Sequence, residues 1–200
     1  MSQPVDLLSE LIKRIEGCRL CEASLPLGAN PVVRAQQSAR LIVAGQAPGI
    51  RVHKTSIPFN DPSGERLRQW MGVDSELFYN ESKIAIIPMA FCYPGRGTRG
   101  DLPPRKECST YWHPRLLPLI PKVELILAIG QYAHTYYLAD RRKKTLTETV
   151  KAWESYLPEI LPLPHPSPRN NIWLKKNPWF EREVIPYLKN RIRRLFESKE

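Results

Sequence analysis

The sequence predicts an α/β fold, namely a three-layer α/β/α sandwich around a central four-stranded, mostly parallel sheet. Short apolar segments typical of buried strands alternate along the chain with segments whose apolar residues recur at helical spacing. Strands that alternate with helices pair in parallel, because each helix carries the chain back across the sheet. No internal repeat, linker or low-complexity segment divides the 200 residues, so we expect residues 1–200 to form a single domain.

Individual elements follow from apolar spacing and from the residues that begin or end them. Residues 5–16 should form a helix, because their apolar side chains recur at helical spacing and Gly17 follows. Residues 63–71 should form another, with Ser63 as its cap and Gly72 at its end. The remaining expected elements are strands at residues 40–44, 83–89, 124–130 and 159–168, and helices at residues 105–120 (made irregular by proline), 131–140 and 177–198.

Unusual loops follow each of the four predicted strands: "GQAPGIRVH", "MAFCYPGRGTRG", "GQYAH" and "HPSPRNN". Many of the 20 prolines cluster at strand ends and in loops, and each one fixes its own φ and restricts the preceding residue. We therefore expect stiff loops. Ligands of parallel α/β sheets bind beyond the carboxyl ends of the strands. Whether these loops meet at one edge depends on the strand order, which the sequence leaves open.

The charge of the chain favours a polyanionic partner. Thirty Lys and Arg against 20 Asp and Glu give a formal net charge of +10, and the pI is near 9.6. Nucleic acid is the leading candidate, through counterion release. The alternative is a basic C-terminal helix around "RIRRLF" that keeps the protein soluble.

Apolar segments are too short for a membrane protein. No apolar run approaches the roughly 20 residues that a membrane-spanning helix requires. The N-terminal segment is amphipathic and contains acidic residues, unlike a signal peptide. We expect a soluble, cytoplasmic monomer without a membrane partner.

Four cysteines have the spacing of a ligand set. Cys18 and Cys21 form C-x2-C, 70 residues follow, and Cys92 and Cys108 form C-x15-C. A tetrathiolate set binds either zinc or an iron–sulfur cluster, and the spacing does not choose between them. A cytoplasmic location disfavours disulfides. The remaining alternative is four unrelated thiols.

Loops and cysteines together resemble the uracil-DNA glycosylase superfamily, and within it the iron–sulfur-containing, thermophile-type branch. The features that carry the resemblance are "GQAPG" after the first strand, "IPF" downstream, the cysteine pattern and "HPSP" after the last strand. The resemblance covers nearly the whole chain, from "CRLC" to the last helix. It implies a structural 4Fe–4S cluster on the four cysteines, which would tie the N-terminal helix to the segment after the second strand.

The resemblance also implies roles for individual residues. Gln46 and Ala47 would border a base pocket, Phe59 would stack on the base, and His165 would hydrogen-bond a uracil carbonyl. These residue types suit the chemistry, because a flipped-out base needs pocket contacts to offset its unstacking. A positioned donor then stabilises the negative charge that builds on the departing base. Phe59 could instead be an ordinary core aromatic.

Three departures from the iron–sulfur branch concern the catalytic groups. That branch usually has glutamate where Gln46 stands, an acid after this motif, and an asparagine just before the third cysteine. Here "GQAPGIRVHKTS" contains no carboxylate, and Pro88 and Met89 stand where the asparagine would fall, which makes Met89 a candidate base contact. Asp61 is the nearest acid, and it could equally cap a helix. His53 is a second candidate base.

Two functions remain. The first is a DNA repair glycosylase that hydrolyses the N-glycosidic bond of a flipped-out deaminated or damaged base, uracil or a related one. The alternative is a catalytically silent DNA- or base-binding protein on the same scaffold. In both, DNA contacts are expected from the loops after the second and fourth strands, at Arg96, Arg99, Ser167, Arg169 and Lys175.

Overall fold

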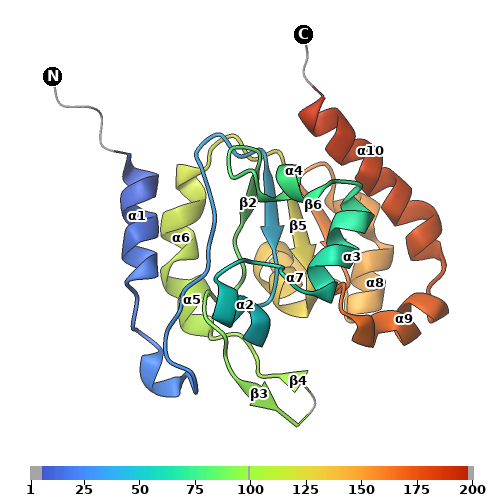
Figure 1. Cartoon of the computed structure of the whole chain (residues 1–200). Coiled ribbons are helices and arrows are strands. Elements are labelled where there is room, and N and C mark those ends of the chain that lie inside the picture. Colours follow the sequence, from blue (N-terminus) through green and yellow to red (C-terminus); the bar gives the residue numbers. More distant parts are fainter. Residues whose placement is uncertain (1–5, 99, 198–200) are drawn as a thin grey trace, which may run out of the picture.

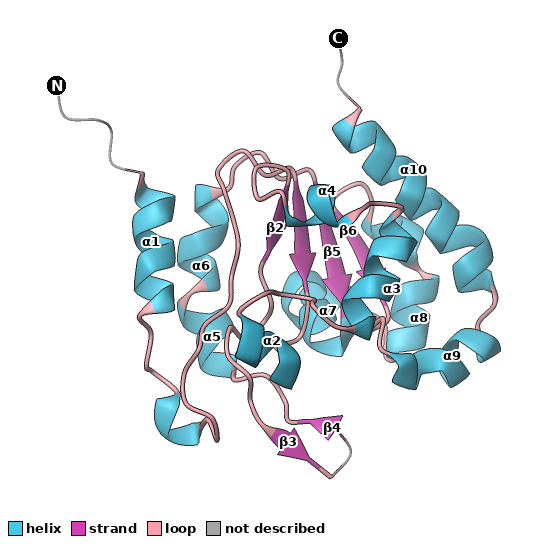
Figure 2. Cartoon of the chain, viewed as in Figure 1, coloured by secondary structure: helices cyan, strands magenta, loops and turns pink. Residues whose placement is uncertain are grey.

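A computed structural model describes residues 6–98 and 100–197 (Figure 1). In this part of the chain, four strands form the central sheet in the order β2 (Ile84–Ile86), β1 (Leu41–Ala44), β5 (Leu125–Ile129) and β6 (Ile160–Leu163). Each neighbouring pair is parallel. Helices flank both faces, which confirms the predicted three-layer α/β/α fold (Figure 2).

Each face of the sheet has its own hydrophobic core. Ile42 and Ala44 of β1 belong to one cluster, and Leu41 and Val43 belong to the other. The first face is covered by α1 (Leu7–Glu16), α5 (Lys106–Tyr111), α6 (His113–Leu116) and α7 (Gly130–Leu138). The second is covered by α3 (Pro62–Met71), α4 (Ser75–Tyr79), α8 (Leu146–Lys151) and α10 (Ile185–Phe196). Burial on both sides explains why the strands read as continuous apolar runs.

Parallel pairing brings the loops after the strands to one edge of the sheet. Three further elements lie in these loops: α2 (Ile50–Thr55) after β1, a hairpin of β3 (Arg96–Gly97) and β4 (Gly100–Asp101) after β2, and α9 (Asn171–Lys176) after β6 (Figure 2). None of the three was predicted, nor were α4 and α8. The convergence that the sequence left open is therefore present.

Proline accounts for most differences from the predicted boundaries. The helix expected at residues 105–120 is divided into α5, α6 and a 3-10 turn at Leu117–Leu119, with prolines near the starts of the latter two. The strand expected at residues 159–168 ends at Leu163, before the Pro-rich loop. The helix expected at residues 177–198 begins with π-helical Phe180–Val184 and continues as α10. Val5, the expected start of the first helix, lies outside the described residues, and Asp6 caps α1.

The start of α3 positions the loop that carries Phe59. Asp61, rather than the predicted Ser63, is the cap, because its Oδ1 accepts the Gly64 N–H at 2.9 Å. Phe59 has a φ of 54°. Its carbonyl oxygen lies so close to Gly64 that a Cβ there would be 1.8 Å away.

We therefore expect Gly64→Ala to lower the free energy of unfolding by about 1–3 kcal/mol, because the new methyl group forces the Phe59 backbone to move. Urea denaturation measures the change. Gly17→Ala is the control, since its Cβ would have no neighbour nearer than 3.6 Å. Equal stability of both variants would contradict the close approach of Phe59 to α3.

Two buried histidines make stability depend on pH. Nε2 of His113 lies 3.1 Å from the carbonyl oxygen of Pro88, and Nε2 of His134 lies 3.0 Å from that of Ala128. Burial lowers the pKa of each imidazole to about 4. In the unfolded chain, both would titrate near 6.5.

Stability should fall as the pH drops from about 6.5 to about 5, because the unfolded chain binds protons that the folded protein does not. The expected slope is about 1.4 kcal/mol per pH unit for each histidine at the lower end of this range. Urea denaturation at several pH values measures it. In His113→Gln, one titrating group is gone, so its profile should be flatter. A flat profile in the parental protein would contradict the buried neutral state.

Candidate functional site

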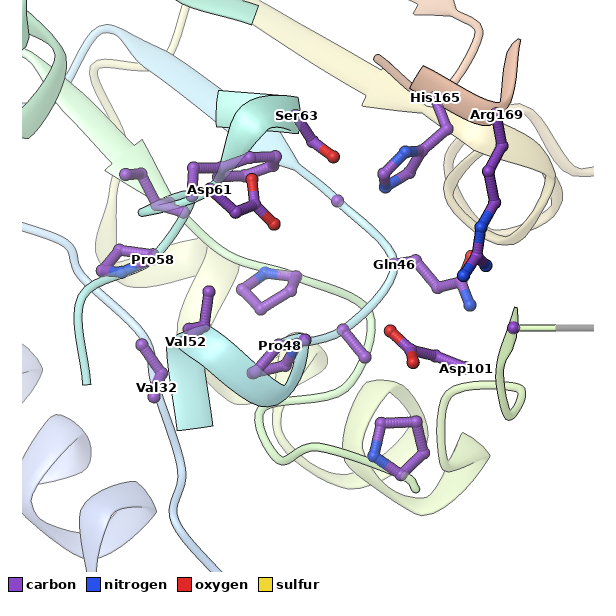
Figure 3. Close-up of a pocket in the computed structure, with 18 residues that line it drawn as sticks. Val32, Gln46, Pro48, Val52, Pro58, Asp61, Ser63, Asp101, His165 and Arg169 are labelled. Carbon is purple, nitrogen blue, oxygen red and sulfur yellow. The ribbon is translucent and has the colours of Figure 1, made fainter. Parts of the chain in front are cut away.

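A pocket with a volume of about 320 Å³ lies at the carboxyl edge of the sheet (Figure 3). This volume is in the range of small-molecule sites. Its walls come from the loops after β1, β2 and β6, from the start of α3 and from β4. The lining residues are Val32, Gly45, Gln46, Ala47, Pro48, Gly49, Val52, Pro58, Phe59, Asp61, Ser63, Ile86, Pro88, Pro94, Gly100, Asp101, His165 and Arg169.

Phe59 serves both the pocket and the core. Its ring packs edge-on against Phe78, with centroids 6.0 Å apart. A Cβ on Gly45 would lie 3.0 Å from Cζ of Phe59, so glycine after β1 lets the ring pack closely against this loop. Tyr79 supports the loop by donating its hydroxyl to the carbonyl of Pro58 at 3.0 Å. The two roles that the sequence left open for Phe59 are thus compatible.

His165 points into the pocket from the loop after β6 (Figure 3). Its Nδ1 accepts the Ser167 N–H at 3.2 Å, and its carbonyl oxygen accepts from Asn170 Nδ2 at 2.6 Å. Burial lowers the pKa of His165, while the carboxylates of Asp61 and Asp101 oppose this shift. The imidazole is therefore neutral at pH 7, and its proton is on Nε2, which makes this atom a hydrogen-bond donor.

Oxygen-bearing side chains enter the pocket from two elements. Asp61 and Ser63 lie on the α3 side, and Asp101 enters from β4 (Figure 3). Asp61 both lines the pocket and caps α3, so its capping bond does not remove it from the site. Asp101 was missed by sequence reasoning. It lies 40 positions beyond Asp61 and belongs to a two-residue strand that shows no apolar alternation.

Two residues predicted for the site lie elsewhere. The half-buried ring of His53 packs against Tyr93, with centroids 6.1 Å apart, instead of facing the pocket. The α2 helix, which the sequence did not reveal, determines this direction. Met89 is 3% exposed and belongs to the core under the first face of the sheet. Pro88, the residue before Met89, lines the pocket.

The predicted DNA contacts differ in how they lie relative to the pocket. Arg169 lines it, Arg96 is exposed on β3, and Lys175 is exposed on α9. Ser167 supports its own loop, since its Oγ accepts the Arg169 N–H at 3.3 Å. Arg99 lies outside the described residues.

The four cysteines line one small second cavity, with Phe91, Arg105 and Trp112 among its other walls. All four are free thiols. Cys92 and Cys108 are buried, and burial raises the pKa of the first to about 11 and of the second to about 12. Within residues 6–98 and 100–197, no group of three or more His, Cys, Asp or Glu side chains is arranged to hold a single metal ion. Four thiols around a shared cavity form a donor set of the kind that both iron–sulfur clusters and zinc take.

None of the helices in residues 6–98 and 100–197 is both long enough and apolar enough to cross a membrane.

Comparison with known families places this architecture. A model described as the uracil DNA glycosylase superfamily matches residues 33–189. The matched range contains the whole sheet, the His165 loop, Phe59 and the hairpin that carries Asp101. Cys18 and Cys21 precede it, whereas Cys92 and Cys108 lie inside it. The chain therefore belongs to the uracil-DNA glycosylase superfamily.

Proposed function

We propose that this protein is a DNA glycosylase that hydrolyses the N-glycosidic bond of a deaminated or damaged base flipped out of the DNA. The observation that carries the proposal is the state of His165. Its Nδ1 is occupied by the Ser167 N–H, and its ring points into the pocket as a neutral donor. Glycosidic cleavage needs such a donor, because negative charge accumulates on the departing base.

The other pocket residues suit recognition of a base. Phe59 supplies an aromatic face for stacking, and the glycines at positions 45 and 49 allow the backbone to approach closely. The Gln46 amide offers both a donor and an acceptor to the edge of the base. Asparagine is absent from the place where iron–sulfur members have it, so we propose a related deaminated or damaged base alongside uracil itself.

DNA binding is supported by charge. The net charge of +10 includes Arg96, which pairs with Asp101 across the β3–β4 hairpin, Arg169 in the pocket wall and Lys175 on α9. Guanidinium and ammonium groups in these places suit phosphates on either side of a flipped nucleotide.

A catalytically silent binder is the second candidate. The observation that favours it is the side chain at position 46, because glutamine stands where the iron–sulfur branch usually has glutamate, so the loop after β1 brings no carboxylate into the pocket. In addition, Asp61 already uses one oxygen to cap α3. Such a protein would bind the same DNA without releasing a base.

Excision assays separate the two candidates. Oligonucleotides carrying uracil, hypoxanthine, xanthine or alkylated bases are incubated with the protein, and abasic sites are measured. We expect excision of at least one base. His165→Ala should reduce that rate by about 10²–10³, because one preorganised donor is lost. DNA affinity should stay near the parental value.

His53→Ala is the matched histidine control and should retain most of the activity, because that ring packs on Tyr93. Parental excision by His165→Ala would refute the role of the imidazole. Binding of DNA without release of any tested base would favour the silent binder.

We further propose that Cys18, Cys21, Cys92 and Cys108 hold a structural 4Fe–4S cluster. When bound, the cluster would serve as a covalent tie between segments far apart in the sequence. The proposal is supported by the shared cavity and by the all-sulfur donor set. Zinc on the same thiols is the alternative.

Protein purified anaerobically should contain about four iron and four sulfide per chain and absorb in the visible range. Cys92→Ala should lose the metal together with folding stability, because metal binding is coupled to folding. Metal analysis and thermal denaturation measure both changes. Colourless protein with one zinc per chain would refute the cluster.

A further inference from the structure

In the described part of the chain, the carboxylate of Asp101 has no structural partner. It lies in β4, lines the pocket and is exposed. Within residues 6–98 and 100–197, its side chain forms no hydrogen bond and no ion pair. Asp61, in contrast, holds the Gly64 N–H at the start of α3. Of the two acids in the pocket, Asp101 is the one with both carboxylate oxygens available to a ligand, whereas Asp61 has one.

Glycines on both sides let the hairpin approach the pocket closely. A Cβ on Gly49 would lie 3.7 Å from Oδ2 of Asp101, so this carboxylate lies over the loop after β1. Gly100 has a φ of 133°, and a Cβ there would be 2.2 Å from Nη1 of Arg169. The guanidinium thus lies against the hairpin, and a side chain at position 100 would push the two apart. These contacts hold Asp101 at the mouth of the pocket.

Asp101 and His165 act on the same space from different depths. The ring of His165 is half-buried, whereas Asp101 is exposed at the rim. The negative charge of Asp101 reaches the imidazole, since it raises the pKa of His165 against the larger lowering by burial. The two groups therefore border the same part of the pocket.

We propose that Asp101 faces the deoxyribose of the flipped nucleotide, where it stabilises the cationic sugar and orients the attacking water. This inference rests on the proposed function. A flipped nucleotide enters base first, and its sugar remains joined to the DNA backbone at the mouth of the pocket. A rim carboxylate then faces the sugar, while the deeper His165 faces the base.

The division of labour satisfies the chemistry of hydrolysis. The C1′–N bond breaks, and its electron pair leaves with the base, whose negative charge is stabilised by the Nε2–H of His165. The sugar becomes positively charged at C1′ and lies beside the Asp101 carboxylate. Water bonds to C1′, and one of its protons passes to Asp101 and from there, through solvent, to the released base. The products are a neutral base and an abasic sugar.

A binding experiment tests this assignment without requiring turnover. Two DNA duplexes are compared: one carries a pyrrolidine nucleotide, whose ring nitrogen is a cation that mimics the charged sugar, and the other carries the neutral tetrahydrofuran analogue. The parental protein should bind the cationic duplex roughly tenfold more tightly, as for a hydrogen bond to a charged group. Asp101→Asn should lose this preference. Its affinity for the neutral duplex should be unchanged or higher, since one negative charge is removed.

Asp140→Asn is the charge-matched control, because Asp140 is also exposed and lies after α7, away from the pocket lining. It should retain the preference for the cationic duplex. Circular dichroism and thermal denaturation establish that both variants fold. Loss of the preference in Asp101→Asn alone supports the assignment. An unchanged preference in Asp101→Asn, or none in the parental protein, overturns it.

Excision assays run in parallel keep this inference distinct from the glycosylase proposal. Suppose that the parental protein releases no base but prefers the cationic duplex, and that Asp101→Asn lacks this preference. The glycosylase proposal then fails, and the placement of Asp101 against the sugar stands. If the parental protein releases a base, and Asp101→Asn does so at the parental rate with the preference intact, the glycosylase proposal stands and the role of Asp101 is refuted.

Discussion

Parallel pairing of β1 with both β2 and β5 is the constraint on which the site depends. Parallel strands end at the same edge of the sheet, so strand direction alone brings the loops after them together there. Both faces of the sheet are buried by helices, which leaves that edge as the place where polar side chains from distant segments can converge on a ligand. The pocket between Phe59, His165 and Asp101 is a direct result.

Much of this arrangement is predictable from the sequence. Strands buried on both faces are continuous apolar runs, and the residues that follow parallel strands lie at the carboxyl edge of the sheet. Phe59, Gln46 and His165 were placed in this way, and all three line the pocket. Strand order was not predictable, since it depends on long-range packing rather than on local spacing. The direction of His53 was missed for a local reason: α2 begins immediately after the "GQAPG" loop and has too few residues to show periodicity.

Several polar groups in the pocket wall have structural partners that limit what they can do. Asp61 caps α3, and the Ser167 N–H fixes the tautomer of His165. Such bonds hold catalytic groups in place before a substrate arrives, which reduces the reorganisation needed during reaction. They also explain why residue type and proximity to a motif are weak guides to role. Asp61 is nearest to the motif in sequence and is partly committed, whereas Asp101 is distant in sequence and remains available.

The hairpin that carries Asp101 is bounded by Cys92 and Cys108, whose buried side chains share a cavity away from the pocket. The residues between them reach the rim, while their two ends are anchored in the core. Such a segment is a module: its sequence and length can change without disturbing the sheet or the groups that hold the base. Substrate preference can therefore diverge within this fold by changes in the β3–β4 hairpin alone. Its anchors at Cys92 and Cys108 and the deeper residues of the pocket then stay the same.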